Sequence, residues 1–135
     1  MKYSSELYSL ALISTATALM WVPYVLARMT THGVLRAIST PGAGYPTDAP
    51  WADRARRAHL NAIENLVVFA PLVLVCAITG VSTRATVLSA QIYVAARLAH
   101  YVIYATGIPV VRTIAFLVGA CATFAIAVVL LSSAT

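Results

Sequence analysis

Polar residues recur at helical spacing inside two apolar stretches of this chain, and their types suit ligand binding and acid–base chemistry. The first set is Arg54, Arg57, Asn61 and Glu64, and the second is Tyr93, Arg97, His100 and Tyr104. Side chains three or four residues apart lie on one face of an α-helix, so each set predicts one polar helical stripe. Ionisable side chains within apolar helices are costly, which makes these residues candidates for function.

Glu64 and Arg97 are predicted to lie at equal depth in their helices. Each is about nine residues from the same end of its apolar segment, or roughly 13 Å along a helix axis. A carboxylate and a guanidinium at equal depth could form a structural ion pair between the two helices. That interpretation leaves the remaining donors of the two stripes unexplained. Their excess over one carboxylate, with Arg112 at the same end, favours a polar cavity for an anionic ligand.

The composition indicates that these stripes lie in a membrane. Hydrophobic residues make up 61% of the 135 residues and charged residues only 10%, whereas a soluble domain has about 25% charged residues. A membrane helix needs about 20 mostly apolar residues. Segments that qualify are 7–29, 58–80, 84–106 and 109–131, the second with a polar extension back to residue 53. We therefore predict an all-α polytopic membrane protein, a single domain built as a bundle of four transmembrane helices.

Proline and glycine mark the connections between these segments. Residues 39–50, with the sequence STPGAGYPTDAP, predict turns. Asp53 suits the N-cap or the first turn of the second helix, and Pro109 suits the first turn of the fourth. Pro23 and Pro71 lie inside predicted helices and are expected to kink them.

The distribution of basic residues predicts the orientation in the membrane. Only Lys2 and Arg84 lie on one side, whereas the other side has Arg28, Arg36, Arg54, Arg56, Arg57 and Arg112. Because basic loops remain in the cytoplasm, we expect a cytoplasmic loop at about 30–52 and both termini outside. The net charge of +5 is therefore interpreted as a topology signal, with contact to membrane lipid, and not as a sign of nucleic-acid binding.

Other kinds of site find little support in the sequence. The histidines at positions 32, 59 and 100 have no spacing that would place two of them on one helical face, so no metal site is predicted. No glycine-rich phosphate loop or catalytic serine motif occurs. Cys76 and Cys121 fall deep in predicted helices and are interpreted as packing residues.

Two multi-residue motifs resemble a known family. The run Arg54-Ala-Arg-Arg-Ala-His-Leu-Asn-Ala-Ile-Glu-Asn65 resembles the second-helix signature of the MAPEG family, the membrane-associated proteins in eicosanoid and glutathione metabolism. A second match runs from Arg97 to Tyr104 and continues at Pro109 and Arg112-Thr113. The segment from Trp21 to Arg28 is similar to the first helix of bacterial members.

The resemblance implies a homotrimer of left-handed four-helix bundles in the inner membrane, with glutathione bound between neighbouring subunits near the cytoplasmic face. The residues implied in glutathione binding are Arg28, Arg54, Arg57, Asn61, Glu64, Arg97, His100 and Tyr104. Arg112 would favour the ionised thiol, and Thr113 stands where some relatives have a serine. The activity implied is conjugation of the thiolate to a hydrophobic electrophile from the bilayer, or reduction of a hydroperoxide. Leu60 and Phe116 depart from the pattern, at positions where relatives often carry a basic residue and a tyrosine.

Two other functions remain open at this point. A non-catalytic bundle could bind lipid or act as a scaffold for another membrane protein. A small proton-coupled exporter could use Glu64 to carry a proton, although an exporter's membrane glutamate should stand away from fixed cations such as Arg57.

Overall fold

The structure, a computed structural model, describes residues 3–39 and 48–134. Its helices are α1 (Ser5–Leu19), α2 (Trp21–His32), α3 (Val34–Ser39), α4 (Pro50–Thr79), α5 (Arg84–Thr106) and α6 (Pro109–Ser132). No strand occurs in the described part of the chain. The prediction of an all-α fold is confirmed.

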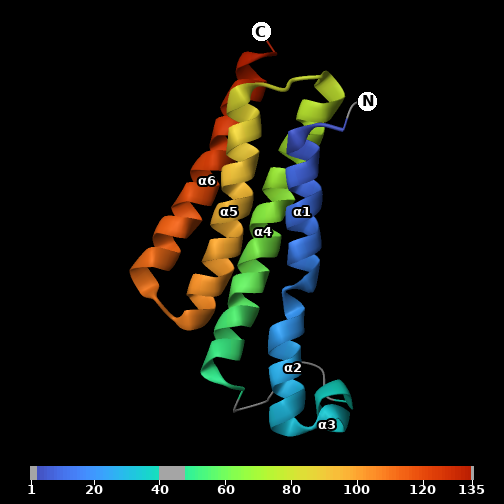
Figure 1. The fold of residues 1–135 in the computed structure, drawn as a ribbon, viewed down its shortest axis with the longest axis vertical. Coiled ribbons are helices and arrows are strands. Elements are labelled where there is room, and N and C mark those ends of the chain that lie inside the picture. Colours follow the sequence, from blue (N-terminus) through green and yellow to red (C-terminus); the bar gives the residue numbers. More distant parts are fainter. Residues whose placement is uncertain (1–2, 40–47, 135) are drawn as a thin grey trace.

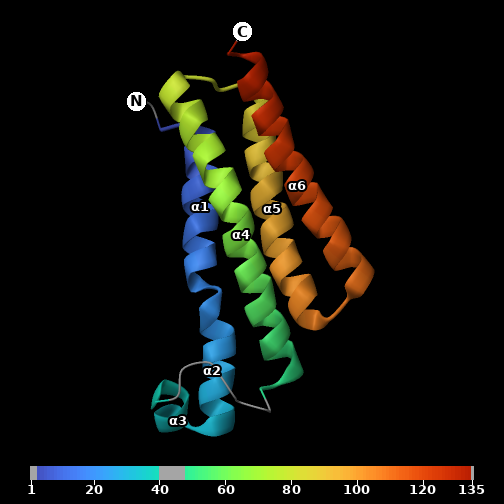
Figure 2. The ribbon, with the colours of Figure 1, turned by 180° about the vertical axis from the view of Figure 1, so that it is seen from behind.

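The long helices run alongside one another in an elongated bundle (Figure 1). Helices α1 and α2 follow each other along one side, and α5 packs against α1, α4 and α6. Both chain termini lie at one end of the bundle, which we call the terminal end, and α3 lies at the other, the α3 end (Figure 1). The view from behind shows the start of α4 and the α5–α6 connection towards the α3 end (Figure 2).

Three segments are long and apolar enough to cross a membrane: Ser5–His32, Pro50–Thr79 and Pro109–Ser132. Together with the helical fold, they identify a membrane protein, as the composition predicts. Helix α5 is not among the three, since polar residues such as Gln91, Arg97 and His100 lower its hydropathy. Its 23 residues would nevertheless extend about 34 Å, and that α5 also crosses the membrane remains a prediction.

The first predicted helix, 7–29, is interrupted at Met20. Pro23 has no N–H to bond the carbonyl of Leu19, which weakens the helix at this point. The Tyr101 hydroxyl of α5 donates to the Met20 carbonyl at 2.8 Å. The Tyr24 hydroxyl lies 2.9 Å from Nδ1 of His59 on α4, so contacts from two other helices hold the break in place.

Helix α4 begins earlier than predicted and runs unbroken through Pro71. Pro50 lies in its first turn, where a missing N–H costs nothing. Asp53 is in that first turn as well, but Ala49 is the N-cap. Residues 34–39, expected in a loop, form α3. Most of the predicted turn segment, 40–47, lies outside the described residues, as does Lys2.

The hydrophobic core is centred on an aromatic pair between α4 and α5. The rings of Phe69 and Tyr93 are stacked with centroids 3.7 Å apart and planes 3° from parallel. Both side chains are fully buried, as is Ile126 of α6. Of the two cysteines interpreted as packing residues, Cys76 is buried and Cys121 is exposed on α6.

A buried carboxylate joins α1 to α5 at the terminal end. Glu6 is 1% exposed, and its Oε1 accepts hydrogen bonds from Thr86 at 2.7 Å and Ser82 at 2.9 Å. Its Oε2 has no hydrogen-bond partner among the described residues. Hydroxyl groups and a backbone N–H therefore compensate this charge within the described chain, with no basic side chain paired to it.

Candidate functional site

Arg97 is the centre of the polar region between α4 and α5. Its side chain is 1% exposed, and Nη2 donates to Oδ1 of Asn65 at 2.8 Å. Nη1 makes a longer bond of 3.5 Å to Oδ1 of Asn61. The Asn65 amide in turn donates to the Asn61 backbone carbonyl at 2.8 Å, which orients both asparagines towards the guanidinium. Neutral amides, and not a carboxylate, therefore bind this buried cation.

The ion pair between Glu64 and Arg97 that equal depth suggested is not formed within the chain. The face of α4 that meets Arg97 passes through Asn61 and Asn65, one turn apart. Glu64 falls at the edge of that face and is exposed. Neighbouring side chains on a helix are separated by a rotation of about 100°, so two residues at equal depth need not point towards each other.

Aromatic rings flank the Arg97 guanidinium. Its Cζ lies 5.3 Å from the Tyr93 ring centroid and 5.1 Å from that of Phe116 on α6. Both distances are within the range of cation–π attraction. Gly119 leaves the space beside the guanidinium, because a Cβ there would be only 2.9 Å from Nε of Arg97.

The polar stripe of α5 continues towards the α3 end and meets the first turns of α6. The His100 and Tyr104 rings are 5.5 Å apart in an edge-to-face arrangement, and Arg112 places Cζ 4.7 Å from the Tyr104 centroid. His100 also lies near Phe116, with centroids 6.2 Å apart. The structure thus brings Arg112 of α6 together with three predicted site residues of α5: Arg97, His100 and Tyr104.

Arg54 and Arg57 have structural partners of their own. The Nε of Arg54 donates to the Ala105 carbonyl at 3.0 Å, near the end of α5, where backbone carbonyls lack helical partners. Its guanidinium lies beside Gly107, which has a φ of +86° and ends the helix. Arg57 pairs with Asp53 one turn away at 2.9 Å, and both side chains are largely exposed.

Arg28 and Thr113 lie at the edges of the predicted site. Arg28, near the end of α2, donates from Nε to Oδ2 of Asp48 at 3.2 Å, and His32 lies 3.3 Å from the same carboxylate. The Arg28 hydrogen bond lowers the pKa of Asp48 below its ordinary value of 3.8. The Thr113 side chain is exposed, and its hydroxyl donates to the Pro109 carbonyl within the first turn of α6.

Comparison with known proteins places the chain in a family. The model of the MAPEG family matches residues 8–132, which is nearly the whole chain. The chain belongs to the MAPEG family.

Curated relatives of this MAPEG protein include the microsomal glutathione S-transferase 1 proteins of Bos taurus, Homo sapiens and Rattus norvegicus. Identities are 37%, 35% and 38%, each over 82 residues that cover 60% of this chain and 53% of the relative. The chain thus spans about half the length of the curated relatives it matches. No solved structure matches it.

The described part of the site in this MAPEG protein has one buried and one half-buried cation without matching acids. No carboxylate forms an ion pair with Arg97 or Arg112 among residues 3–39 and 48–134. Guanidinium groups bind carboxylates strongly and in two-point geometry. The arrangement can therefore receive an anionic ligand, with a histidine and a tyrosine beside it.

Sequence reasoning missed two partners that shape this site. Asn65 makes the shortest bond to Arg97, and its position four residues after Asn61 was a signal that it shares the polar stripe. Asp48 binds Arg28 from the segment before α4. No helical periodicity relates those two residues, so no comparable signal was available.

Proposed function

We propose that this MAPEG protein is a membrane-bound, glutathione-dependent transferase or peroxidase that acts on hydrophobic electrophiles. Family membership and the relatives named microsomal glutathione S-transferase 1 support a glutathione-related function in a membrane. The observation that carries the proposal is the cluster of buried Arg97 and His100 with half-buried Tyr104 and Arg112, which has positive charge and no carboxylate partner within the described chain.

Each part of glutathione has a group of suitable charge in this proposal. The carboxylates of the tripeptide bind Arg57, Asn61 and the remaining donors of Arg54 and Arg97, with Arg28 at the edge. The α-ammonium binds Glu64, and His100 and Tyr104 line the cavity. Arg112 lowers the pKa of the bound thiol, since the thiolate is the reactive form. The Thr113 hydroxyl turns from the Pro109 carbonyl, which it binds in the free chain, to donate to the sulfur.

Two reactions are open to a thiolate in such a site. In conjugation, sulfur forms a bond to an electrophilic carbon while a leaving group departs with its electron pair, or the electrophile adds and then takes a proton. In peroxide reduction, two glutathione molecules are oxidised to the disulfide, and the hydroperoxide becomes an alcohol and water. The electrophile enters from the bilayer, because the flanking helix faces are apolar.

The exposure of Glu64 supports a homotrimer. Glu64 lies on α4 among apolar residues and is exposed on the single chain. A carboxylate that faces lipid is costly, so membrane acids usually face protein or a water-filled cavity. We therefore place a neighbouring subunit against this face of α4, with glutathione between the two chains. The protein lies in the inner membrane, with the α3 end in the cytoplasm and both termini outside.

Calorimetric titration of glutathione into the detergent-solubilised protein tests this function. We expect saturable binding by the wild type, at least tenfold weaker binding by Arg112→Ala, and little change in the matched control Arg56→Ala, an exposed arginine of α4 outside the proposed site. Ultraviolet absorbance of the bound thiolate should appear with the wild type and be absent with Arg112→Ala. A folded wild type that binds no glutathione, or full thiolate formation with Arg112→Ala, would refute the assigned roles.

A further inference from the structure

The corner between α5 and α6, residues 105–109, is tied to α4 by one side chain. The Nε of Arg54 donates to the Ala105 carbonyl at 3.0 Å, and the two Nη groups form no hydrogen bond or ion pair with a described residue. Residues 106–111 are exposed on the single chain, so packing contributes little to the position of the corner. The corner and the start of α4 both lie towards the α3 end (Figure 2). The Arg54 bond therefore restrains the corner directly against α4.

The Ala105 carbonyl needs this donor because the backbone offers none. In a continuing helix the carbonyl would accept from the N–H of residue 109, which here is Pro109 and has no N–H. The N–H of Ile108 donates instead to the Ile103 carbonyl at 3.4 Å. Among the described residues, no backbone N–H bonds to the Ala105 carbonyl. Arg54 thus supplies the donor that the backbone lacks where α5 ends.

Gly107 leaves the space that the Arg54 guanidinium occupies. This glycine ends α5 with a φ of +86°, a conformation that is costly for a residue with a side chain. A Cβ at position 107 would lie 3.2 Å from both Cζ and Nε of Arg54. A cation at this place also suits the negative end of the helix dipole. The guanidinium therefore packs directly against the backbone of the corner.

The corner sets the position of Arg112. The Arg112 N–H donates to the Ile108 carbonyl at 3.4 Å in the first turn of α6. The Arg112 Cζ lies 4.7 Å from the ring centroid of Tyr104, the residue that precedes Ala105. Both contacts of Arg112 are thus made to residues at or next to the corner. A corner that moves against α4 would carry Arg112 with it.

We propose that Arg54 is a positioning residue, whose hydrogen bond to the Ala105 carbonyl holds the corner and thereby places Arg112 beside the thiol of bound glutathione. This inference rests on the proposed function. The role uses the Nε of Arg54 and is separate from carboxylate binding by the two Nη groups. It also differs from a direct effect of the Arg54 charge on the thiol, for which any cation at position 54 would be sufficient. The two roles predict opposite rankings for two substitutions.

Glutamine and lysine at position 54 separate the hydrogen bond from the charge. The Nε2 of glutamine is the same number of bonds from Cα as the Nε of arginine, and it donates a hydrogen bond without charge. Lysine keeps the charge but has a methylene group at that place. Arg54→Met removes both the donor and the charge at similar side-chain length. The measurement is the ultraviolet absorbance of bound glutathione thiolate as a function of pH, with detergent-solubilised protein saturated with glutathione.

We expect the midpoint of thiolate formation in Arg54→Gln to stay close to that of the wild type. Arg54→Lys and Arg54→Met should raise it by about one pH unit. A shift of this size results when a charge moves from about 4 to about 6 Å from the thiolate at an effective dielectric constant of about 20. The remaining charged and titratable groups of the site are common to all variants: Arg57, Glu64, Arg97, His100 and Tyr104. Their contributions therefore cancel in the comparison.

Amide hydrogen exchange of the same proteins without glutathione tests the corner itself. The N–H groups of Gly107, Ile108 and Arg112 should exchange about two- to tenfold faster in Arg54→Met and Arg54→Lys, as expected for the loss of one hydrogen bond. Exchange in Arg54→Gln should match that of the wild type. Circular dichroism checks that every variant is helical.

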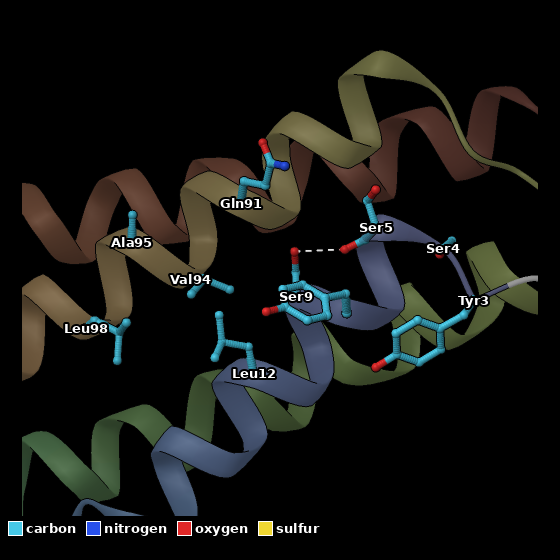
Figure 3. A pocket seen from close by; sticks show the side chains of 10 residues that line it. Tyr3, Ser4, Ser5, Ser9, Leu12, Gln91, Val94, Ala95 and Leu98 are labelled. Carbon is cyan, nitrogen blue, oxygen red and sulfur yellow. Dashed lines mark hydrogen bonds between the residues drawn. The ribbon is translucent and has the colours of Figure 1, made fainter.

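Two control variants change side chains outside the corner. Arg56→Met removes an exposed arginine of α4. Gln91→Met alters an exposed residue of α5 that lines a groove between α1 and α5 (Figure 3), about 21 Å along the helix from Ala105. Neither variant should change the exchange at the corner or the midpoint of thiolate formation.

Two results would overturn the proposal. One is equal exchange at the corner in the wild type and a folded Arg54→Met protein. The other is a thiolate midpoint closer to the wild type in Arg54→Lys than in Arg54→Gln, which would assign the effect to the charge. A wild type that binds no glutathione would refute the proposed function instead. The exchange measurement, which needs no glutathione, would then still decide whether Arg54 holds the corner and the first turn of α6.

Discussion

Gly119 of α6 lies against the Arg97 guanidinium, and replacing it by alanine should test whether that guanidinium is held as tightly as its contacts imply. A Cβ at position 119 would lie 2.9 Å from Nε, 3.0 Å from Cζ and 3.0 Å from Nη2 of Arg97. Favourable contacts between nonbonded heavy atoms occur at about 3.5–4.0 Å. The guanidinium or α6 would therefore have to move by roughly 0.5–1 Å.

The free-energy cost of this movement follows from the surroundings of Arg97. The Tyr93 and Phe116 rings flank the guanidinium, and Asn65 binds it at 2.8 Å, so it cannot swing aside freely. Overpacking of a tight core costs about 1–3 kcal/mol. Alanine in place of glycine also favours the helix by about 1 kcal/mol, so Gly119→Ala alone would show a net destabilisation of only about 0–2 kcal/mol.

A double-mutant cycle with Arg97→Leu separates these terms. Leucine lacks the Nε, Cζ and Nη2 atoms that would meet the new methyl group. The helix-propensity gain is the same in both backgrounds and cancels in the difference. We expect a coupling of about 1–3 kcal/mol, with Gly119→Ala neutral or stabilising in the Arg97→Leu background. The assay is unfolding in mixed detergent micelles followed by circular dichroism.

The outcome that refutes this reasoning is additivity. Independent sites add within about 0.5 kcal/mol. A coupling below that value would mean that the guanidinium yields to the methyl group at little cost, and that the ring and amide contacts do not fix its position. The anion site proposed around Arg97 would then lack a rigid cation.

Three further perturbations concern contacts outside the Arg97 cluster. Asp48→Asn should lower thermal stability at neutral pH, by an amount that shrinks as pH falls below 3.8 and vanishes below the depressed pKa of Asp48. The Arg28 hydrogen bond depresses the pKa of Asp48 below that ordinary value, so its stabilisation is complete above pH 3.8 and is lost as pH falls through the depressed value. Thr86→Val should cost about 1–3 kcal/mol in micelle unfolding, because the buried Glu6 carboxylate loses its 2.7 Å donor; an unchanged stability would argue against that bond. Tyr101→Phe should cost about 0.5–1.5 kcal/mol by the same assay, since one hydrogen bond to the break between α1 and α2 is removed, and a larger loss would show that the break collapses without it.

On α5, helical spacing was sufficient to predict which polar residues share a stripe. Arg97, His100 and Tyr104 lie on α5 as their spacing indicates, and Arg112 reaches Tyr104 from the start of α6. These contacts depend on the helical period and on a short connection between neighbouring helices, both of which can be read from the sequence. The all-α fold and the membrane class follow equally directly from composition and the lengths of apolar segments.

The direction of each stripe could not be predicted in the same way. Asn61, Glu64 and Asn65 lie within about 100° of one another on α4, and only packing against α5 decides which of them meet Arg97. The interruption at Met20 has a local cause in Pro23, but the hydroxyl that binds the Met20 carbonyl comes from Tyr101, 81 positions along the chain. Contacts of this kind depend on tertiary packing, for which a single sequence has no periodic signal.

Two buried charges in residues 3–39 and 48–134 are stabilised in different ways. Glu6 and Arg97 are each 1% exposed, and within the described residues neither is paired with an opposite charge. A counterion would cancel most of the field of either group in a medium of low dielectric constant. Hydroxyl donors from the start of α5 compensate Glu6 at the terminal end. Amides and ring faces hold Arg97 without neutralising it, so its positive field remains available to an anion on the side where His100 and Arg112 lie.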